Sequence, residues 1–210
     1  MTTPTAAKPI ETHYAGCRFR SRLEARWAVL FDHLHIRWQY EPQGYFIGSA
    51  GVPYLPDFYL PDQQTWVEVK GDEDDLDFDL LVAAATRERG LPLSLDPGNT
   101  RWPVVKLRMV ILGVVPAGPM FHLGLVAVDD LVGKQMVTPL CVSPVEPNLR
   151  HGHEMVPIST PQELGVDPET GRLRRPIGLF RGFGFGFPCS QIDDAYQAAR
   201  SARFEHGESG

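Results

Sequence analysis

The stretch YLPDFYLPDQQTWVEVKG, residues 54–71, decides the fold of this chain because it predicts two neighbouring β-strands. Aromatic and β-branched residues dominate two segments, roughly Tyr54–Leu60 and Thr65–Lys70, and such residues favour strands. The polar residues between them, Pro61–Gln64, suit a four-residue hairpin loop. The stretch therefore predicts an antiparallel hairpin.

The length of this loop predicts the register of the hairpin. It places Leu60 opposite Thr65, and Asp57 then lies directly opposite Glu68. Side chains alternate along a strand, so Glu68 and Lys70 share one face. Two carboxylates and an ammonium group therefore converge on that face.

The other face of the predicted hairpin is apolar, which supports the register independently. Phe58 lies opposite Val67 and Pro56 lies opposite Val69 in this pairing. Strand pairing is specified most strongly where one face is buried, because a slip of one residue would turn the apolar set to solvent. We therefore expect Phe58 and the two valines to anchor the hairpin in a core.

Like charges opposed in this way need an explanation. Directly paired residues have Cβ atoms roughly 4.5–5.5 Å apart, so two carboxylates there destabilise a sheet. Lys70 can neutralise part of the repulsion, and carboxylate oxygens on adjacent strands also suit a hard divalent cation such as Mg²⁺. The pattern predicts either a metal site or a hairpin whose solvated face carries three charges.

The chain around the hairpin alternates helical and strand patterns. Apolar residues at helical spacing predict an amphipathic helix over 21–36, and acids at the start with arginines at the end predict a second over 74–89. Strands are predicted over 37–47, 104–115 and 120–128, and a terminal helix begins at Ser190. This α-β-β-β-α-β order predicts an α/β (α+β) fold, with a mixed central sheet flanked by helices.

We expect three parts along the chain. Residues 1–16 are polar and contain proline, which predicts a flexible N-terminal arm. Residues 17–130 carry the helices and strands of the core. Residues 131–210 are rich in proline and glycine and predict a loop-rich C-terminal extension that ends in the helix from Ser190.

Composition limits the classes of function. The chain has 20 Lys and Arg against 26 Asp and Glu, and its net charge of −6 argues against a protein that binds nucleic acids over its whole surface. Six of the acids lie in Asp72–Asp79, and without them 20 acids balance 20 bases, which leaves room for local basic patches.

The cellular setting is predicted from the cysteines and from the apolar segments. Three cysteines, an odd number and far apart, suit free thiols in a reducing compartment. The N-terminus lacks the apolar segment of a signal peptide, and no stretch approaches the ~18 apolar residues that span a bilayer. We therefore expect a cytoplasmic protein with no membrane partner.

At the hairpin the chain resembles the PD-(D/E)XK nuclease superfamily, the restriction-endonuclease-like proteins. Pro56-Asp57 matches the PD element of that family and Glu68-Val69-Lys70 matches (D/E)XK. The element order over residues 21–115, roughly half of the chain, is that of the αβββαβ family core. More narrowly, the chain resembles small nuclease-like proteins of actinobacteria and their phages.

The resemblance implies Mg²⁺- or Mn²⁺-dependent hydrolysis of DNA phosphodiester bonds. Asp57 and Glu68 would hold the metal, with the Val69 carbonyl as a further ligand, and Lys70 would orient water or stabilise negative charge on the phosphate. Glu24, on the first helix, matches a further acid of the family site that binds a second metal or acts through a water molecule. The pattern Ser21-x-x-Glu24 is also a capping box, in which Glu24 binds backbone at the helix start.

The implied partner is DNA. Four arginines at the start of the first helix either contact phosphates or lie on a solvated helix face: Arg18, Arg20, Arg22 and Arg26. The acidic run Asp72–Asp79 would repel DNA that passes close to it, so the run or the C-terminal extension is a candidate surface for a protein partner.

Two classes of function remain open. The first is an endonuclease that acts on phage, mobile-element or recombination DNA, in the host cytoplasm if the chain is phage-encoded. A two-fold homodimer would suit cleavage of both strands. The second is a non-catalytic DNA-binding or assembly protein that retains the nuclease fold.

Overall fold

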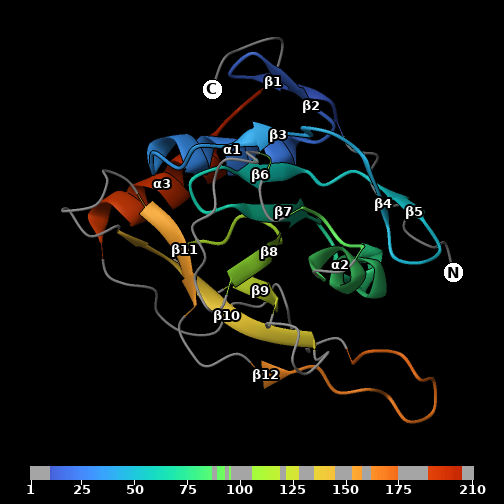
Figure 1. Cartoon of the computed structure of the whole chain (residues 1–210). Coiled ribbons are helices and arrows are strands. Elements are labelled where there is room, and N and C mark those ends of the chain that lie inside the picture. The colour runs from blue at the N-terminus through green and yellow to red at the C-terminus, as the bar shows by residue number, and fades with distance from the viewer. Residues whose placement is uncertain are drawn as a thin grey trace, which may run out of the picture.

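The computed structural model describes residues 10–86, 89–92, 95, 106–118, 122–127, 135–144, 153–157, 162–174 and 189–204. Within these residues the chain forms a mixed eight-stranded sheet and three α-helices (Figure 1). In spatial order the sheet contains β11 (His153–Pro157), β10 (Gln135–Pro144), β9 (His122–Ala127), β8 (Lys106–Leu112), β7 (Thr65–Val69), β6 (Phe58–Leu60) and β3 (Gln39–Tyr40), while β12 (Gln162–Glu163) pairs with β10.

The helices and two small hairpins surround this sheet. The helices are α1 (Arg22–His33), α2 (Phe78–Ala85) and α3 (Ser190–Ser201), with a short 3-10 helix η1 (Glu73–Asp75) before α2. The hairpins are β1 (Thr12–Tyr14) with β2 (Cys17–Phe19), and β4 (Tyr45–Ile47) with β5 (Val52–Tyr54). Strands β7 and β8 are parallel, whereas the other neighbours in the sheet are antiparallel. The predicted mixed sheet flanked by helices is confirmed.

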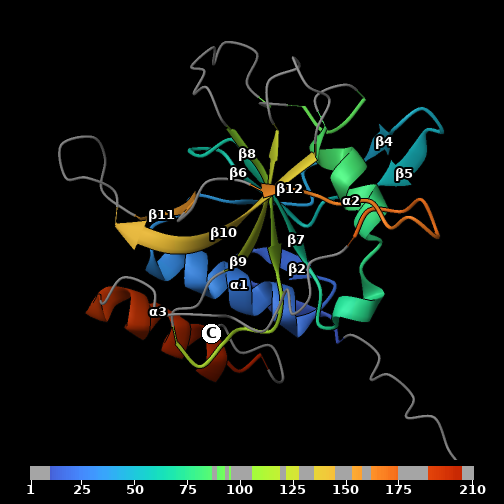
Figure 2. The same ribbon diagram turned by 90° about the horizontal axis from the view of Figure 1, so that it is seen from below.

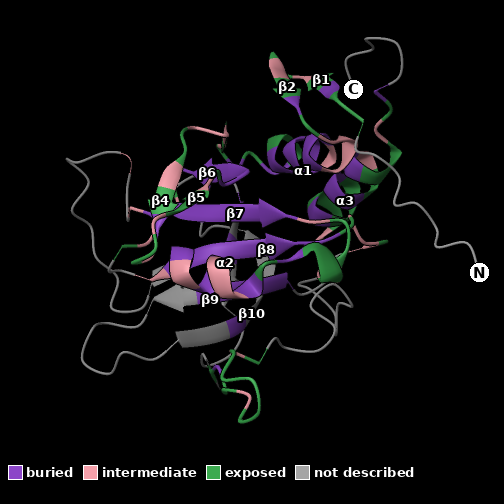
Figure 3. Ribbon diagram, turned by 90° about the vertical axis from the view of Figure 1, so that its right-hand side faces the viewer, coloured by how far each residue is buried: buried purple, intermediate pink, exposed green. Residues whose placement is uncertain are grey.

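The sheet separates two hydrophobic cores. On one face, Phe58, Val67 and Val110 belong to the core that α1 and α3 cover, and these two helices lie side by side (Figure 2). On the other face, Trp66 and Met109 belong to the core that α2 covers. In β7, Trp66 belongs to one core and Val67 and Val69 to the other, and all five residues of the strand are buried (Figure 3).

Helix α1 begins where the sequence predicts it. The Ser21 hydroxyl oxygen accepts a hydrogen bond from a backbone N–H of the first turn. The helix ends at His33 rather than at the predicted Ile36. His35 adopts a left-handed φ of 54°, and the Ile36 N–H bonds back to the Phe31 carbonyl at 2.8 Å. This pattern is a Schellman motif, which closes the helix and turns the chain toward β3.

Two predicted strands are each interrupted, which corrects the prediction. The strand predicted over 37–47 forms β3 and β4, and the strand predicted over Tyr54–Leu60 forms the end of β5 and β6. Glu41 has a left-handed φ of 41° and ends β3, so β4 is a separate strand. Pro56 lies between β5 and β6 and has no N–H to donate to a ladder. The chain between Glu41 and Pro56 therefore forms its own β4–β5 hairpin beside the main sheet.

The helix predicted over 74–89 was wrong in its bounds. Asp72 caps η1, and Asp77 caps α2 by accepting a hydrogen bond from the Leu80 N–H at 3.1 Å. Leu76, between them, has an extended backbone with ψ 120°. Aspartates favour such caps over helix interiors, so the acidic run divides the predicted helix into η1 and the shorter α2.

The C-terminal extension predicted over 131–210 contains α3 from Ser190 as expected, but it also contains β10, β11 and β12. The prediction of a loop-rich segment omitted these strands. Pro139 and Pro144 lie inside β10, and proline lowers any strand prediction because it cannot donate to the ladder. Pairing with β9, β11 and β12 outweighs that local preference.

The N-terminal arm predicted over 1–16 is described only from residue 10 onward, since residues 1–9 lie outside the described residues. Its last residues form β1, which pairs with β2. The turn between them has left-handed φ values of 47° at Ala15 and 78° at Gly16, the two-residue geometry that joins antiparallel strands tightly. In the described part of the chain, no helix has both the length and the apolar character that a bilayer crossing requires.

We predict a pH-dependent stability from His122, which is buried beneath α1 and α3. Its Nε2 lies 2.7 Å from the Tyr196 hydroxyl, and burial lowers the pKa of His122 to about 4. The unfolded chain binds this proton near the ordinary pKa of about 6.5, so the folded state loses stability as the pH falls between these values. The loss should reach about 3 kcal/mol by pH 4.

Urea unfolding of the wild type and of His122→Gln, measured from pH 7 to pH 4, checks this expectation. The wild type should lose more free energy of unfolding than the variant, whereas the exposed-site control His33→Gln should follow the wild type. Parallel curves for wild type and His122→Gln would contradict the assignment.

Candidate functional site

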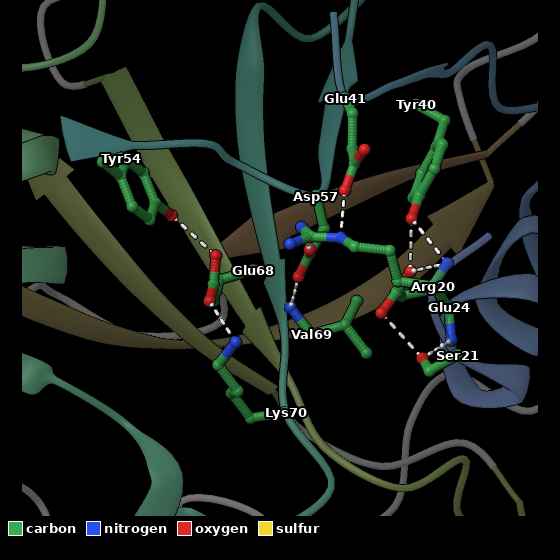
Figure 4. A network of polar contacts seen from close by, with 10 residues as sticks. All are labelled: Arg20, Ser21, Glu24, Tyr40, Glu41, Tyr54, Asp57, Glu68, Val69 and Lys70. Carbon is green, nitrogen blue, oxygen red and sulfur yellow. Dashed lines mark hydrogen bonds and ion pairs between the residues drawn. The ribbon is translucent and has the colours of Figure 1, made fainter. Parts of the chain in front are cut away.

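The hairpin of β6 and β7 has the predicted register. Phe58 pairs with Val67 and Leu60 pairs with Thr65. Asp57, which directly precedes β6, and Glu68, within β7, are 3% and 4% exposed. Two acidic residues therefore lie almost fully buried at the same end of the hairpin (Figure 4).

Glu68 has one partner on each carboxylate oxygen. Its Oε1 lies 2.9 Å from the Lys70 ammonium nitrogen, and its Oε2 accepts a hydrogen bond of 2.7 Å from the Tyr54 hydroxyl. Burial alone would lower the pKa of Lys70, but attraction to Glu68 and Asp57 outweighs it and raises that pKa. Lys70 is therefore charged at neutral pH. Burial also raises the pKa of Tyr54, helped by Glu68, so Tyr54 donates as a neutral hydroxyl.

Asp57 likewise has a partner on each oxygen. Its Oδ2 accepts a hydrogen bond of 2.7 Å from the Val69 N–H, and its Oδ1 lies 3.3 Å from the Arg20 guanidinium. Burial, followed by repulsion from Glu68, raises the pKa of Asp57 well above its ordinary range. The free protein thus keeps two mutually repelling acids close together, at an energetic cost.

Glu24 lies at the start of α1 and has the contacts of a helix cap. Its Oε1 accepts a hydrogen bond of 2.7 Å from the Ser21 hydroxyl. Its Oε2 accepts from the Tyr40 hydroxyl at 2.6 Å and from the Arg20 N–H at 3.1 Å. The capping role is therefore present in this structure, and the polar network joins the start of α1 to the Asp57 centre through Arg20 (Figure 4).

The four arginines predicted to contact DNA have different surroundings. Arg18 is exposed and pairs with Glu11. Arg20 pairs with Asp57 and Glu41. Arg22 and Arg26 are half-buried on α1. Of the four, the described contacts bring Arg20 directly to the predicted acidic centre.

The acidic run that follows Lys70 serves local structure in part. Two of its aspartates cap η1 and α2, as described above. Asp79 forms an ion pair of 2.6 Å with Arg172, which comes from the C-terminal extension. These contacts agree with the prediction that acidic residues of this run lie at the start of a helix.

The donor chemistry of the centre fits a hard divalent cation held by two carboxylates. Mg²⁺ commonly takes one or two carboxylates from a protein and keeps several waters. Each oxygen of Asp57 and Glu68 has a hydrogen-bonding partner, but an ionised carboxylate oxygen can accept a second one. Over the described residues, no group of three or more His, Cys, Asp or Glu side chains is placed to hold a metal.

Sequence reasoning missed three contacts of this centre. Tyr54 was assigned only to a strand, although it lies three residues before Asp57. Glu41 falls within the strand predicted over 37–47, and Arg20 is predicted either to contact phosphate or to lie on a solvated helix face. Arg20 and Glu41 meet beside Asp57, whereas Tyr54 contacts Glu68. No local pattern specifies the left-handed backbone of Glu41 or the β4–β5 hairpin that places Tyr54 there.

Comparison of the chain with protein-family models, with curated proteins and with solved structures finds no match. The side chains of this centre are therefore the basis for a proposed function.

Proposed function

We propose that the chain is a metal-dependent deoxyribonuclease, an endonuclease that hydrolyses DNA phosphodiester bonds with Mg²⁺ or Mn²⁺. One observation carries the proposal: Asp57, Glu68 and Lys70 converge at one end of a buried hairpin, in the predicted register. Buried pairs of like charges that shift one another's pKa are typical of catalytic sites.

The arrangement of elements supports the resemblance to the PD-(D/E)XK superfamily. Helix α1, strands β3, β6 and β7, helix α2 and strand β8 follow one another in the expected α-β-β-β-α-β order, with the β4–β5 hairpin inserted. Strands β3, β6, β7 and β8 are neighbours in the sheet. On this reading the signature residues lie at one end of the β6–β7 hairpin: Pro56 and Asp57 directly precede β6, Glu68 and Val69 end β7, and Lys70 follows it. The additional strands β9 to β12 extend the sheet beyond β8.

Each residue has a role in this proposal. Asp57 and Glu68 would hold the cation, with the Val69 carbonyl as a further candidate ligand. A bound divalent cation supplies polarisation of the phosphate and lowers the pKa of an attacking water. Lys70, held on Glu68 by a 2.9 Å contact, would present positive charge where negative charge develops on the phosphate.

The remaining polar residues of the network would position this centre. Tyr54 fixes one oxygen of Glu68, and Glu24 fixes the start of α1 close to Asp57. Glu24 also stays a candidate for a further catalytic or metal-binding carboxylate. Its entry into the centre would require that it release the Ser21 or Tyr40 hydroxyl.

The second candidate is a non-catalytic DNA-binding or assembly protein with the same fold. The observation that favours it is that protein groups already contact all four oxygens of Asp57 and Glu68. In such a protein the centre would be a structural polar network. The acidic run and the extension would then offer surfaces to a protein partner, and both classes would suit phage, mobile-element or recombination DNA.

A cleavage assay separates these candidates. We expect the purified protein, incubated with supercoiled, linear, branched or single-stranded DNA, to give products only with Mg²⁺ or Mn²⁺, and Asp57→Ala to give none. Asp62→Ala is the matched control, because Asp62 lies at the opposite end of the same hairpin and pairs with Arg37. The absence of any Asp57-dependent product on all four substrates would favour the binding protein.

A further inference from the structure

Arg20 supplies a solvent-accessible cation to the buried carboxylate of Asp57. Its Nη2 lies 3.3 Å from Asp57 Oδ1, and the Arg20 side chain is 56% exposed whereas that of Asp57 is 4% exposed. The guanidinium therefore neutralises part of the acidic centre from the solvent side. A second cation that takes Oδ1 must share this oxygen with Arg20 or displace it.

Arg20 has another anionic partner that it keeps when it leaves Asp57. Its Nε forms an ion pair with Glu41 Oε1 (Figure 4). The Glu41 N–H bonds to the Asp57 carbonyl at 2.9 Å, so the backbone of Glu41 is fixed beside Asp57. Displacement of the guanidinium from Asp57 would leave its ion pair with Glu41 intact, which makes the displacement less costly than the loss of both contacts.

The backbone of Arg20 is fixed independently of its side chain. Its N–H donates to Glu24 Oε2 at 3.1 Å and to the Tyr40 hydroxyl at 2.9 Å. Removal of the guanidinium therefore leaves the contacts that tie this residue to α1 and β3. Arg20→Ala therefore removes the contacts of the guanidinium with Asp57, Glu41 and Tyr40 but keeps these two backbone hydrogen bonds.

We propose that Arg20 is the resident counter-ion of the Asp57–Glu68 centre, that a divalent cation displaces it, and that Arg20 thereby sets the cation affinity of the centre. This inference rests on the cation-dependent function proposed above. The two cations compete for one carboxylate oxygen, so loss of the guanidinium strengthens cation binding. It also leaves the two carboxylates less neutralised when no cation is bound.

Calorimetric titration of the full chain with Mn²⁺ tests the competition directly. The Arg20–Asp57 contact is a charge-assisted hydrogen bond, and solvent around the exposed guanidinium weakens it. Loss of a competing contact of this strength corresponds to an increase in cation affinity of about 10-fold. We therefore expect Arg20→Ala to bind Mn²⁺ about 10-fold more tightly than the wild type. Arg18→Ala is the control: Arg18 lies two residues before Arg20, and its exposed guanidinium pairs with Glu11. This variant should bind Mn²⁺ like the wild type.

Thermal unfolding provides a readout that does not depend on cleavage. In chelator, Arg20→Ala should unfold at a lower temperature than Arg18→Ala, and saturating Mn²⁺ should raise its midpoint by more than it raises that of the wild type. A larger rise in Arg18→Ala than in Arg20→Ala would overturn the inference.

The binding pattern also separates this inference from the proposed function. If the wild type binds Mn²⁺, Asp57→Ala does not, and Arg20→Ala binds with equal or lower affinity, the inference fails while the cation site stands. If neither the wild type nor Arg20→Ala binds Mn²⁺, both the inference and the cation-dependent function fail.

Discussion

Replacement of Lys70 by alanine is expected to lower metal-dependent DNA cleavage by about 10²–10³-fold, the usual effect of removing one group that stabilises transition-state charge. Lys70 is the ammonium group on the predicted catalytic face, and its nitrogen lies 2.9 Å from Glu68. Neighbouring carboxylates raise its pKa although burial opposes them, so it carries its charge at the pH of the assay. Single-turnover rates at saturating Mg²⁺ measure the loss.

The same substitution should leave the fold intact. The Lys70 side chain is 36% exposed, and the Lys70 backbone keeps its N–H bond to the Leu112 carbonyl at 2.9 Å. Arg37→Ala serves as a matched control, because it removes an exposed cation paired with Asp62 at the other end of the hairpin. Equal cleavage by Lys70→Ala and the wild type would remove Lys70 from the mechanism, and equal losses in both variants would indicate a general electrostatic effect.

The register of the β6–β7 hairpin could be predicted from the sequence because two independent patterns agree on it. The four residues 61–64 set the loop length, and the apolar pairing of Phe58 with Val67 allows no slip of one residue. The same register places Asp57 and Glu68 at one end of the hairpin. Local rules suffice here because all the residues concerned lie within 15 positions of one another.

The partners of these acids could not be predicted in the same way. Arg20 reaches Asp57 across 37 positions of sequence, and Tyr54 reaches Glu68 only because β4 and β5 leave the main sheet as a separate hairpin. That departure depends on the left-handed backbone of Glu41, which is uncommon for a residue other than glycine. Side-chain contacts of this kind follow from the packed structure and not from local propensity.

In the sheet beyond β8 the prediction failed for another reason: a segment whose composition predicts a loop forms strands in the folded chain. The prolines of β10 indicated a loop, yet β10 pairs with β9, β11 and β12. A strand with neighbours on both sides gains burial that a propensity estimate does not count. The acidic run gives a milder example, since its aspartates predict one helix start but cap two separate helices, Asp72 at η1 and Asp77 at α2.

Replacement of Phe58 by alanine is expected to lower the free energy of unfolding by about 3–5 kcal/mol, the range for a large-to-alanine change at a fully buried aromatic residue. Phe58 is 0% exposed and directly follows Asp57. Its ring lies 5.5 Å from that of Phe31, edge to face, and 5.4 Å from that of Tyr40, with Trp38 at 5.8 Å. The substitution would leave a cavity where α1, β3 and β6 meet, because these rings cannot all move to fill it.

Phe46→Ala is the matched control, because Phe46 lies on the β4–β5 hairpin with 76% of its surface exposed. Its loss should change the free energy of unfolding by no more than about 0.5 kcal/mol. Phe58→Leu, which keeps most of the volume, should cost less than about 1.5 kcal/mol. Urea unfolding at constant pH measures the free energy of unfolding of all three variants. If Phe58→Ala loses no more free energy of unfolding than Phe46→Ala, this aromatic cluster does not anchor the hairpin that carries Asp57 and Glu68.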